Sequence, residues 1–263
     1  MKELWEHLIR MDYDEVFNIL SLGHILTCTL FVIGFILIFL KAGDIRKIPI
    51  FKKLEKLLVF VVIGAQGIYY FWYFILGAGG DAYPLYLCRI AGLLICITYF
   101  IPIKPLEDFA IMSCIYGGIS STFFSSPKPF AFPHITRWAY FTMHIGMVYL
   151  ALLRVVFHHK IFTKKELLNA EILTVITCII VLSLDIKFGW NYMFFMNIKP
   201  PEMPIIEDIT WFEPLNVKPW MTSCFMFFAY MFGAFCAWAF TSWMSRKALR
   251  MEFVEAFEDA KKL

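Results

Sequence analysis

Residues 19–40 read ILSLGHILTCTLFVIGFILIFL, an uninterrupted stretch without a lysine, arginine, aspartate or glutamate. As an α-helix it would extend about 33 Å, slightly more than the hydrocarbon core of a bilayer at about 30 Å. Lipid offers no hydrogen-bond partner to exposed backbone groups, so a segment of this kind crosses as a helix. This stretch therefore predicts a membrane protein.

The rest of the chain repeats the pattern. It is 60% hydrophobic and 19% aromatic with a mean hydropathy of +0.68, which excludes a soluble globular domain. We predict an all-α fold, a polytopic membrane helix bundle of about seven transmembrane helices, with residues 1–263 forming a single integral membrane domain. After 19–40, the predicted spans are 57–76, 84–101, 106–124, 135–157, 168–186 and 220–244, of which 106–124 is the least apolar.

Three segments outside the spans differ from them in composition. Residues 1–18 mix apolar and acidic side chains and predict an interfacial segment on the outer surface. Residues 187–219 combine an aromatic run with five prolines, which favours an outer interfacial lid rather than a helix. Residues 245–263 place apolar side chains at helical spacing among charges and predict a cytoplasmic amphipathic helix.

The lysines and arginines predict the orientation. Sixteen follow the first, third, fifth and seventh spans, and seven lie on the opposite side, with Arg89 inside a span. Because cytoplasmic loops carry the excess of cations, we expect a multi-pass protein of the cell membrane with its N-terminus outside and its C-terminus in the cytoplasm.

The polar residues of the spans gather in one leaflet under this topology. Ionisable residues are costly in lipid and usually functional, so their clustering predicts a site in the outer half of the membrane. The candidates are Cys88 and His144 as catalytic residues and Arg89, His24, Asn191 and Tyr192 as substrate-binding residues.

Cysteine and histidine together form a nucleophile and a general base. The imidazole of His144 would take the thiol proton of Cys88, and the thiolate would attack an ester carbonyl. Arg89 or the Asn191 amide would stabilise the oxyanion or hold a lipid phosphate. We expect the sulfur and the imidazole to meet directly or through one water, beside a cleft open to the outer leaflet.

Other interpretations of the same residues are open. Each polar residue has a structural reading, as a snorkelling arginine, a core cysteine or a histidine that packs between helices. His24, His144 and Cys88 are also zinc-ligand types, although no H-x-x-x-H spacing accompanies them. The whole chain could instead be a transporter or binding protein that holds an anionic small molecule or lipid on Arg89, or a structural subunit. The seven cysteines contain no C-x-x-C pair and predict neither a disulfide framework nor a metal centre.

Four short motifs carry a family resemblance. They are Tyr83-Pro-Leu-Tyr-Leu-Cys-Arg-Ile90, the run Phe-Asn-Ile-Leu-Ser-Leu-Gly-His that ends at His24, Met143-His-Ile-Gly146, and Asn191-Tyr192-Met193. In this order they resemble the YwaF-like bacterial integral membrane proteins, which are related to the transmembrane protein 164 acyltransferases and, more distantly, to the androgen-induced lipid hydrolases.

The resemblance implies a cysteine-dependent lipid acyltransferase or acyl hydrolase. Cys88 matches the nucleophile of the family and His144 its base, while His24, Arg89 and Asn191 match conspicuous positions. Tyr86 departs from the motif, which has histidine there. Membrane lipids would be the substrates, with no cofactor, no metal and no nucleic acid partner.

Overall fold

The computed structural model describes residues 8–9, 18, 20–42, 48–75, 83–124, 133–157, 162–196 and 219–260. The regular structure among these residues is helical, and the helices are given in chain order. They are α2 (Leu22–Leu40), α4 (Pro49–Ile75), α5 (Leu87–Phe100), α6 (Lys104–Phe123), α7 (Ile135–Phe157), α8 (Lys164–Phe188), the 3₁₀ helix η2 (Tyr192–Phe194) and α10 (Pro219–Ala260).

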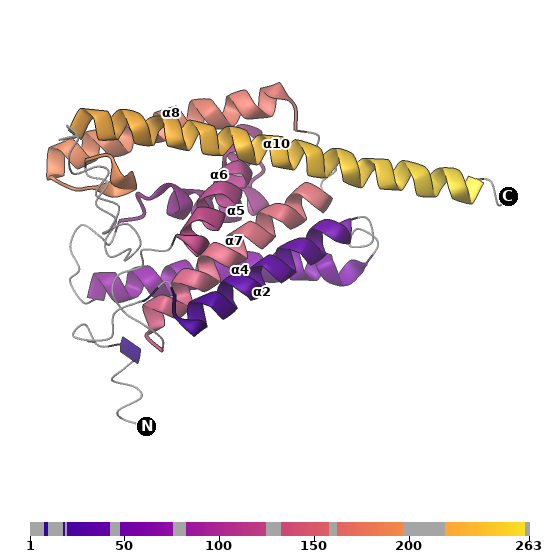
Figure 1. The fold of residues 1–263 in the computed structure, drawn as a ribbon, viewed down its shortest axis with the longest axis horizontal. Helices are drawn as coiled ribbons and strands as arrows, with labels where there is room; N and C mark the ends of the chain where they lie inside the picture. The colour runs from indigo at the N-terminus through magenta and orange to yellow at the C-terminus, as the bar shows by residue number, and fades with distance from the viewer. Residues whose placement is uncertain are drawn as a thin grey trace.

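The seven α-helices coincide with the seven predicted spans, which confirms the all-α membrane bundle. Five of them, α2, α4, α7, α8 and α10, are long and apolar enough to cross a membrane, and α5 is a shorter apolar helix of 14 residues. The largest extensions beyond the predicted spans are in α4, which begins at Pro49, and α10, which continues to Ala260. Figure 1 shows α10 running beyond the ends of its neighbours.

Helix α7 lies at the centre of the bundle and α2 at its edge. In α7, 78% of the apolar window is buried, against 11% in α2. Helix α6 packs on α5, α7, α8 and α10, so it faces protein more than lipid. Glycines and hydroxyl side chains are therefore tolerated in it, because small residues allow helices to approach closely and a surrounded helix needs no apolar coat. This explains why 106–124 has the weakest apolar signal.

The connections make successive helices run in alternating directions (Figure 1). The starts of α2, α5 and α7 consequently lie at the same end of the bundle as the ends of α6 and α8. We call this the Cys88 end. The starts of α6 and α8 lie at the opposite, Lys104 end.

The end of α8 returns the chain to the start of α5. Gly189 closes the helix in the left-handed conformation at φ 69°, which glycine adopts without strain. The following residues form η2, where the Tyr192 N–H donates to the Asp185 carboxylate at 3.0 Å. The Tyr83 N–H donates to the Tyr192 hydroxyl at 3.2 Å, and Trp190 stacks on the Tyr83 ring.

The three predicted flanking segments are described only in part. Of residues 1–18, the structure describes 8, 9 and 18, and the Trp72 indole donates to the Ile9 carbonyl at 3.1 Å. Residues 197–218 of the predicted lid lie outside the described residues, as do 261–263. The backbone of 245–260 continues α10 as a helix, and the interfacial and cytoplasmic placements stay predictions.

Candidate functional site

Cys88 lies in the first turn of α5, where its side chain is half-buried. Helix α6 approaches it at Gly117: a Cβ added there would lie 3.2 Å from the Cys88 Cβ, so a larger residue would require a shift of a few tenths of an ångström. The Ser121 side chain lies within hydrogen-bonding reach of the Cys88 sulfur. A hydroxyl in that position can donate to a thiolate and stabilise it.

His144 lies in the middle of α7 and is 1% exposed. Its Nδ1 lies 2.7 Å from the carbonyl oxygen of Tyr140, one turn earlier. A carbonyl only accepts, so Nδ1 carries the hydrogen, and in the neutral ring Nε2 holds the lone pair. Nε2 is buried and has no hydrogen-bond partner. The imidazole is thus fixed in the tautomer that a general base at Nε2 requires.

The last turn of α6 connects the cysteine with the histidine. The Tyr140 hydroxyl donates to the Ser121 carbonyl at 3.0 Å, and the Tyr140 ring lies 4.2 Å from the His144 ring, centroid to centroid. Gly118 lets α7 approach α6, since a Cβ there would lie 3.0 Å from the His144 carbonyl oxygen. Residues 117–121 therefore contact both the turn that carries Cys88 and the turn that carries His144.

The direct contact expected between the two reactive groups is absent. No hydrogen bond joins the Cys88 sulfur to a ring nitrogen of His144, although both side chains are described. Helix α6 packs on both α5 and α7, and α5 also contacts α7 directly. Proton transfer across this arrangement would use a bridging water or a small movement of α5.

Arg89 follows Cys88 and is 7% exposed. Its Nη2 donates to the Tyr69 hydroxyl at 2.9 Å, and its guanidinium carbon lies over the rings of Tyr69 at 4.6 Å and Tyr86 at 4.9 Å. Aromatic faces attract a cation in a desolvated setting. The guanidinium lies within electrostatic range of both Cys88 and His144. Arg89 is thus a fixed positive charge beside the thiol rather than a snorkelling side chain.

His24 forms a hydrogen bond with a backbone carbonyl in the last turn of α6. Its Nε2 lies 2.9 Å from the Thr122 carbonyl oxygen and 3.2 Å from the Cys28 sulfur. The last carbonyls of a helix lack partners within it, and a membrane protein must supply them from elsewhere. Nε2 must carry the hydrogen to bind a carbonyl, so this nitrogen cannot deprotonate Cys28. The observed contact is structural, whereas the predicted substrate-binding role of His24 stays a prediction.

Asn191 and Tyr192 lie at the Cys88 end, as expected, and both contact other groups of the protein. The side-chain amide oxygen of Asn191 accepts a hydrogen bond from the Met196 backbone N–H at 2.9 Å. The Tyr192 ring packs edge-on against Tyr86 at 5.0 Å, next to the turn that carries Cys88 and Arg89. Tyr192 therefore contacts the residue that precedes the cysteine turn. A role in substrate binding stays a prediction for both residues.

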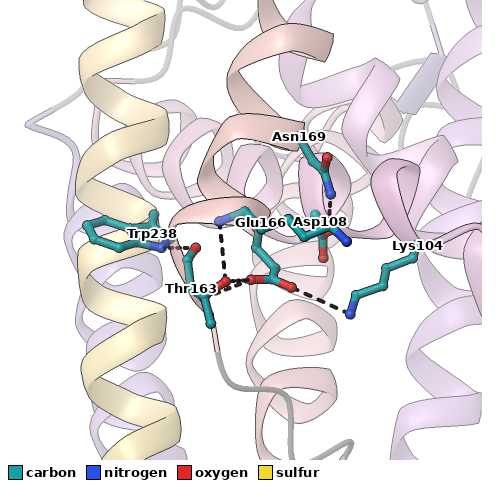
Figure 2. Close-up of polar contacts among 7 residues, drawn as sticks. Lys104, Asp108, Thr163, Glu166, Asn169 and Trp238 are labelled. Carbon is teal, nitrogen blue, oxygen red and sulfur yellow. Dashed lines mark hydrogen bonds and ion pairs between the residues drawn. The ribbon is translucent and has the colours of Figure 1, made fainter.

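A second polar cluster lies at the Lys104 end, between α6, α8 and α10 (Figure 2). Glu166 forms an ion pair with Lys104 at 3.5 Å and closes a capping box with Thr163 at the start of α8. The Asn169 amide donates to the buried Asp108 carboxylate at 3.0 Å. The Trp238 indole donates to the Thr163 carbonyl at 2.8 Å, which ties α10 to the same turn. These contacts fix the helices at the end away from Cys88.

A family model described as the TMEM164 family matches residues 19–241. The chain belongs to the TMEM164 family. Comparison with curated proteins and with solved structures finds no match. The matched residues include all six candidate residues and every helix from α2 to the membrane part of α10. Membership in the TMEM164 family and the apolar helices establish a multi-pass membrane protein.

The zinc alternative has no support in the geometry of this TMEM164 family member. Within the described ranges, no group of three or more histidine, cysteine, aspartate or glutamate side chains is placed to hold a metal ion. His24 is directed at Thr122 and His144 at Tyr140, so their ring nitrogens do not converge with Cys88 on one point.

Ser121, Tyr140 and Tyr69 were not among the residues that the sequence predicted. Each is a hydroxyl residue in or beside an apolar span, a type that is common in membrane helices and carries no motif. One signal was available: Tyr140 lies one turn before His144, and side chains four residues apart share a helix face.

Proposed function

We propose that this TMEM164 family member is a membrane-embedded lipid acyltransferase or acyl hydrolase. Cys88 is the nucleophile, and His144 is the general base. The site lies in the half of the bilayer next to the Cys88 end, and the charge bias of the loops places that end outside the cell. The acyl donor is an ester of a membrane lipid, because the half-buried thiol lies inside the membrane domain, where lipids are the available esters.

The state of His144 is the observation that carries the proposal. A packing histidine in a membrane span would satisfy both ring nitrogens, because an unpaired polar atom in a low-dielectric interior costs about 1–3 kcal/mol. Here Nδ1 is bound to the Tyr140 carbonyl and the buried Nε2 has no partner. A buried polar atom without a partner needs an explanation, and in a catalytic site the missing partner is the substrate or the reacting group.

The reaction proceeds in two halves. In the first, Nε2 of His144 accepts the Cys88 proton, the sulfur bonds to the acyl carbon, and the C–O ester bond breaks. The proton then passes to the departing alkoxide, which leaves as an alcohol. In the second half, His144 deprotonates a lipid hydroxyl or water, whose oxygen attacks the thioester and releases the Cys88 thiol. A lipid acceptor gives transfer and water gives hydrolysis.

Arg89 and Ser121 support the charges that this reaction creates. The Ser121 hydroxyl lies within reach of the Cys88 sulfur and can donate to the thiolate. The buried guanidinium of Arg89 lies within electrostatic range of the same sulfur, in surroundings that weaken screening. Such fixed donors and charges lower the barrier without reorganising during the reaction.

Anion binding by Arg89 is the competing function. Its motivation is the burial of a guanidinium in a membrane helix. The guanidinium of Arg89 already donates to the Tyr69 hydroxyl and lies over the rings of Tyr69 and Tyr86. These contacts favour a fixed electrostatic role over a transport site. Acylation of Cys88 would favour the acyl-transfer function over anion binding.

The test is acyl labelling of the purified protein in lipid nanodiscs. An alkyne-tagged long-chain acyl ester of p-nitrophenol is the donor, and mass spectrometry locates the acyl group. We expect a thioester at Cys88 that Cys88→Ala removes and hydroxylamine releases. Cys96→Ala is the matched control, because Cys96 lies on the same helix, is buried, and contacts the Val59 carbonyl rather than Ser121. Equal labelling of the Cys88→Ala variant and wild type would refute the proposal.

A further inference from the structure

A pocket of about 430 Å³ lies along α2, beside the end of α6. It is lined by His24, Ile25, Cys28, Thr29, Val32, Ile33 and Phe123. We call it the α2 groove. The α2 residues recur at intervals of three and four, so they form one stripe of the helix. From Ile25 to Ile33 the stripe extends about 12 Å, against about 15 Å for one leaflet of the hydrocarbon core.

The polar groups of the groove are turned towards the protein. His24 Nε2 binds the Thr122 carbonyl, and the Thr29 hydroxyl donates to the Ile25 carbonyl of its own helix at 2.8 Å. The Cys28 sulfur lies 3.7 Å from the Thr122 carbonyl oxygen. An occupant therefore meets mainly hydrocarbon along the stripe, which excludes polar and charged ligands and favours an apolar chain.

The groove starts next to the turn that contacts Cys88. On α6, Ser121 lies within reach of the Cys88 sulfur, while the next two residues, Thr122 and Phe123, contact or line the groove. The stripe then runs from the Cys88 end towards the middle of the bilayer. A lipid acyl chain has the same direction, with its ester near the surface and its methyl end at the bilayer centre.

We propose that the α2 groove binds the acyl chain of the lipid whose ester reacts at Cys88. The occupant is a lipid acyl chain because α2 is a membrane span with little of its surface buried, so the groove opens into bilayer hydrocarbon. This assignment rests on the proposed function and identifies the groove as the site that selects for the length of the acyl chain. Filling the groove should remove the advantage of long chains over short ones.

Groove-filling and matched variants test the assignment. Val32→Trp places an indole in the groove, whereas Leu30→Trp places one on an exposed position of α2 outside it. The acyl chain leaves bilayer hydrocarbon rather than water, so its preference for the groove comes from packing contacts with the lining side chains. We expect Val32→Trp to remove these contacts and to lower Cys88 labelling by a long-chain acyl ester about tenfold. Labelling by a butyryl ester should stay within about twofold of wild type, and Leu30→Trp should match wild type with both donors.

A binding measurement keeps the inference separate from catalysis. A phosphatidylcholine whose acyl chain carries a diazirine is incorporated in the nanodiscs and cross-linked to the Cys88→Ala variant. We expect adducts concentrated on the lining residues Ile25, Cys28, Thr29, Val32 and Ile33 and competed by unlabelled long-chain lipid. Cross-links in the groove without Cys88 labelling would refute the proposed function and leave the groove assignment standing. Adducts distributed evenly over Leu26, Leu30 and Leu37 would show general lipid contact and overturn the groove assignment.

Discussion

Nδ1 of His144 donates to the carbonyl oxygen of Tyr140 at 2.7 Å, within a single helix turn. The relationship fixes which nitrogen of the imidazole is basic, and it does so with a backbone group that no side-chain substitution at residue 140 removes. The Tyr140 side chain adds a second constraint, because its hydroxyl binds α6 at Ser121 while its ring packs on His144.

The first prediction concerns the base at residue 144. In His144→Asn, the side-chain amide can still donate to the Tyr140 carbonyl, but no basic nitrogen remains. We expect Cys88 acylation to fall by about 100-fold or more, the size of a general-base contribution, with thermal unfolding in detergent close to wild type. Acylation of Cys88 by the long-chain ester is the readout. An unchanged rate in a folded His144→Asn protein would exclude His144 as the base.

The second prediction concerns the Tyr140 hydroxyl. Tyr140→Phe loses the bond to the Ser121 carbonyl and keeps the ring beside His144. We expect a loss of stability of about 1 kcal/mol together with slower acylation of Cys88. Tyr149→Phe is the matched control, because the Tyr149 hydroxyl on the same helix donates to the Phe31 carbonyl at 2.9 Å. That variant should lose similar stability and acylate normally. Equal rates in both variants would argue against positioning by Tyr140.

The third prediction uses the glycines of α6. Gly118→Ala would bring a Cβ within 2.4 Å of a Val148 methyl carbon, and Gly117→Ala would press on Cys88. We expect both variants to separate α6 from its neighbours, lowering stability by about 1–3 kcal/mol, with Gly117→Ala also changing thiol reactivity towards maleimide. Gly64→Ala meets nothing within 4 Å and should be neutral or slightly stabilising. A silent Gly118→Ala would contradict the tight α6–α7 packing.

The fourth prediction distinguishes structural from substrate roles for His24. His24→Gln retains an amide donor for the Thr122 carbonyl, whereas His24→Leu leaves that carbonyl unsatisfied. We expect His24→Leu to lose about 1–2 kcal/mol of stability and His24→Gln to recover part of it, measured by unfolding in detergent. If His24→Leu is as stable as wild type but slows acylation, His24 acts on the substrate and the helix-end contact is incidental.

The fifth prediction concerns orientation. The excess of cations at the Lys104 end predicts that the Cys88 end faces outside. In a variant with the native cysteines replaced, a membrane-impermeant maleimide added to intact cells should label a cysteine introduced at Tyr83 and spare one introduced at Lys104. The opposite pattern would reverse the topology and place the site in the inner half of the bilayer.

The sequence alone determined the helices and the grouping of the candidate residues. A span in lipid must be helical and apolar, so α2, α7 and α8 follow from composition and length alone. Alternation of the spans then places Cys88 and His144 at one end, because successive helices reverse direction. The family motifs pointed to the same two residues, and the family match from residue 19 to 241 confirms the family but not their roles.

Only the tertiary structure decided how the groups of the site contact one another. Which nitrogen of His144 is basic depends on a 2.7 Å contact, and whether Cys88 and His144 form a hydrogen bond depends on how α5, α6 and α7 pack together. His24 became a partner for the end of α6 because Thr122 presents a carbonyl there. Such contacts depend on helix rotation and on approach distances set by small residues, and a pattern of apolar residues does not specify either to the accuracy of a hydrogen bond.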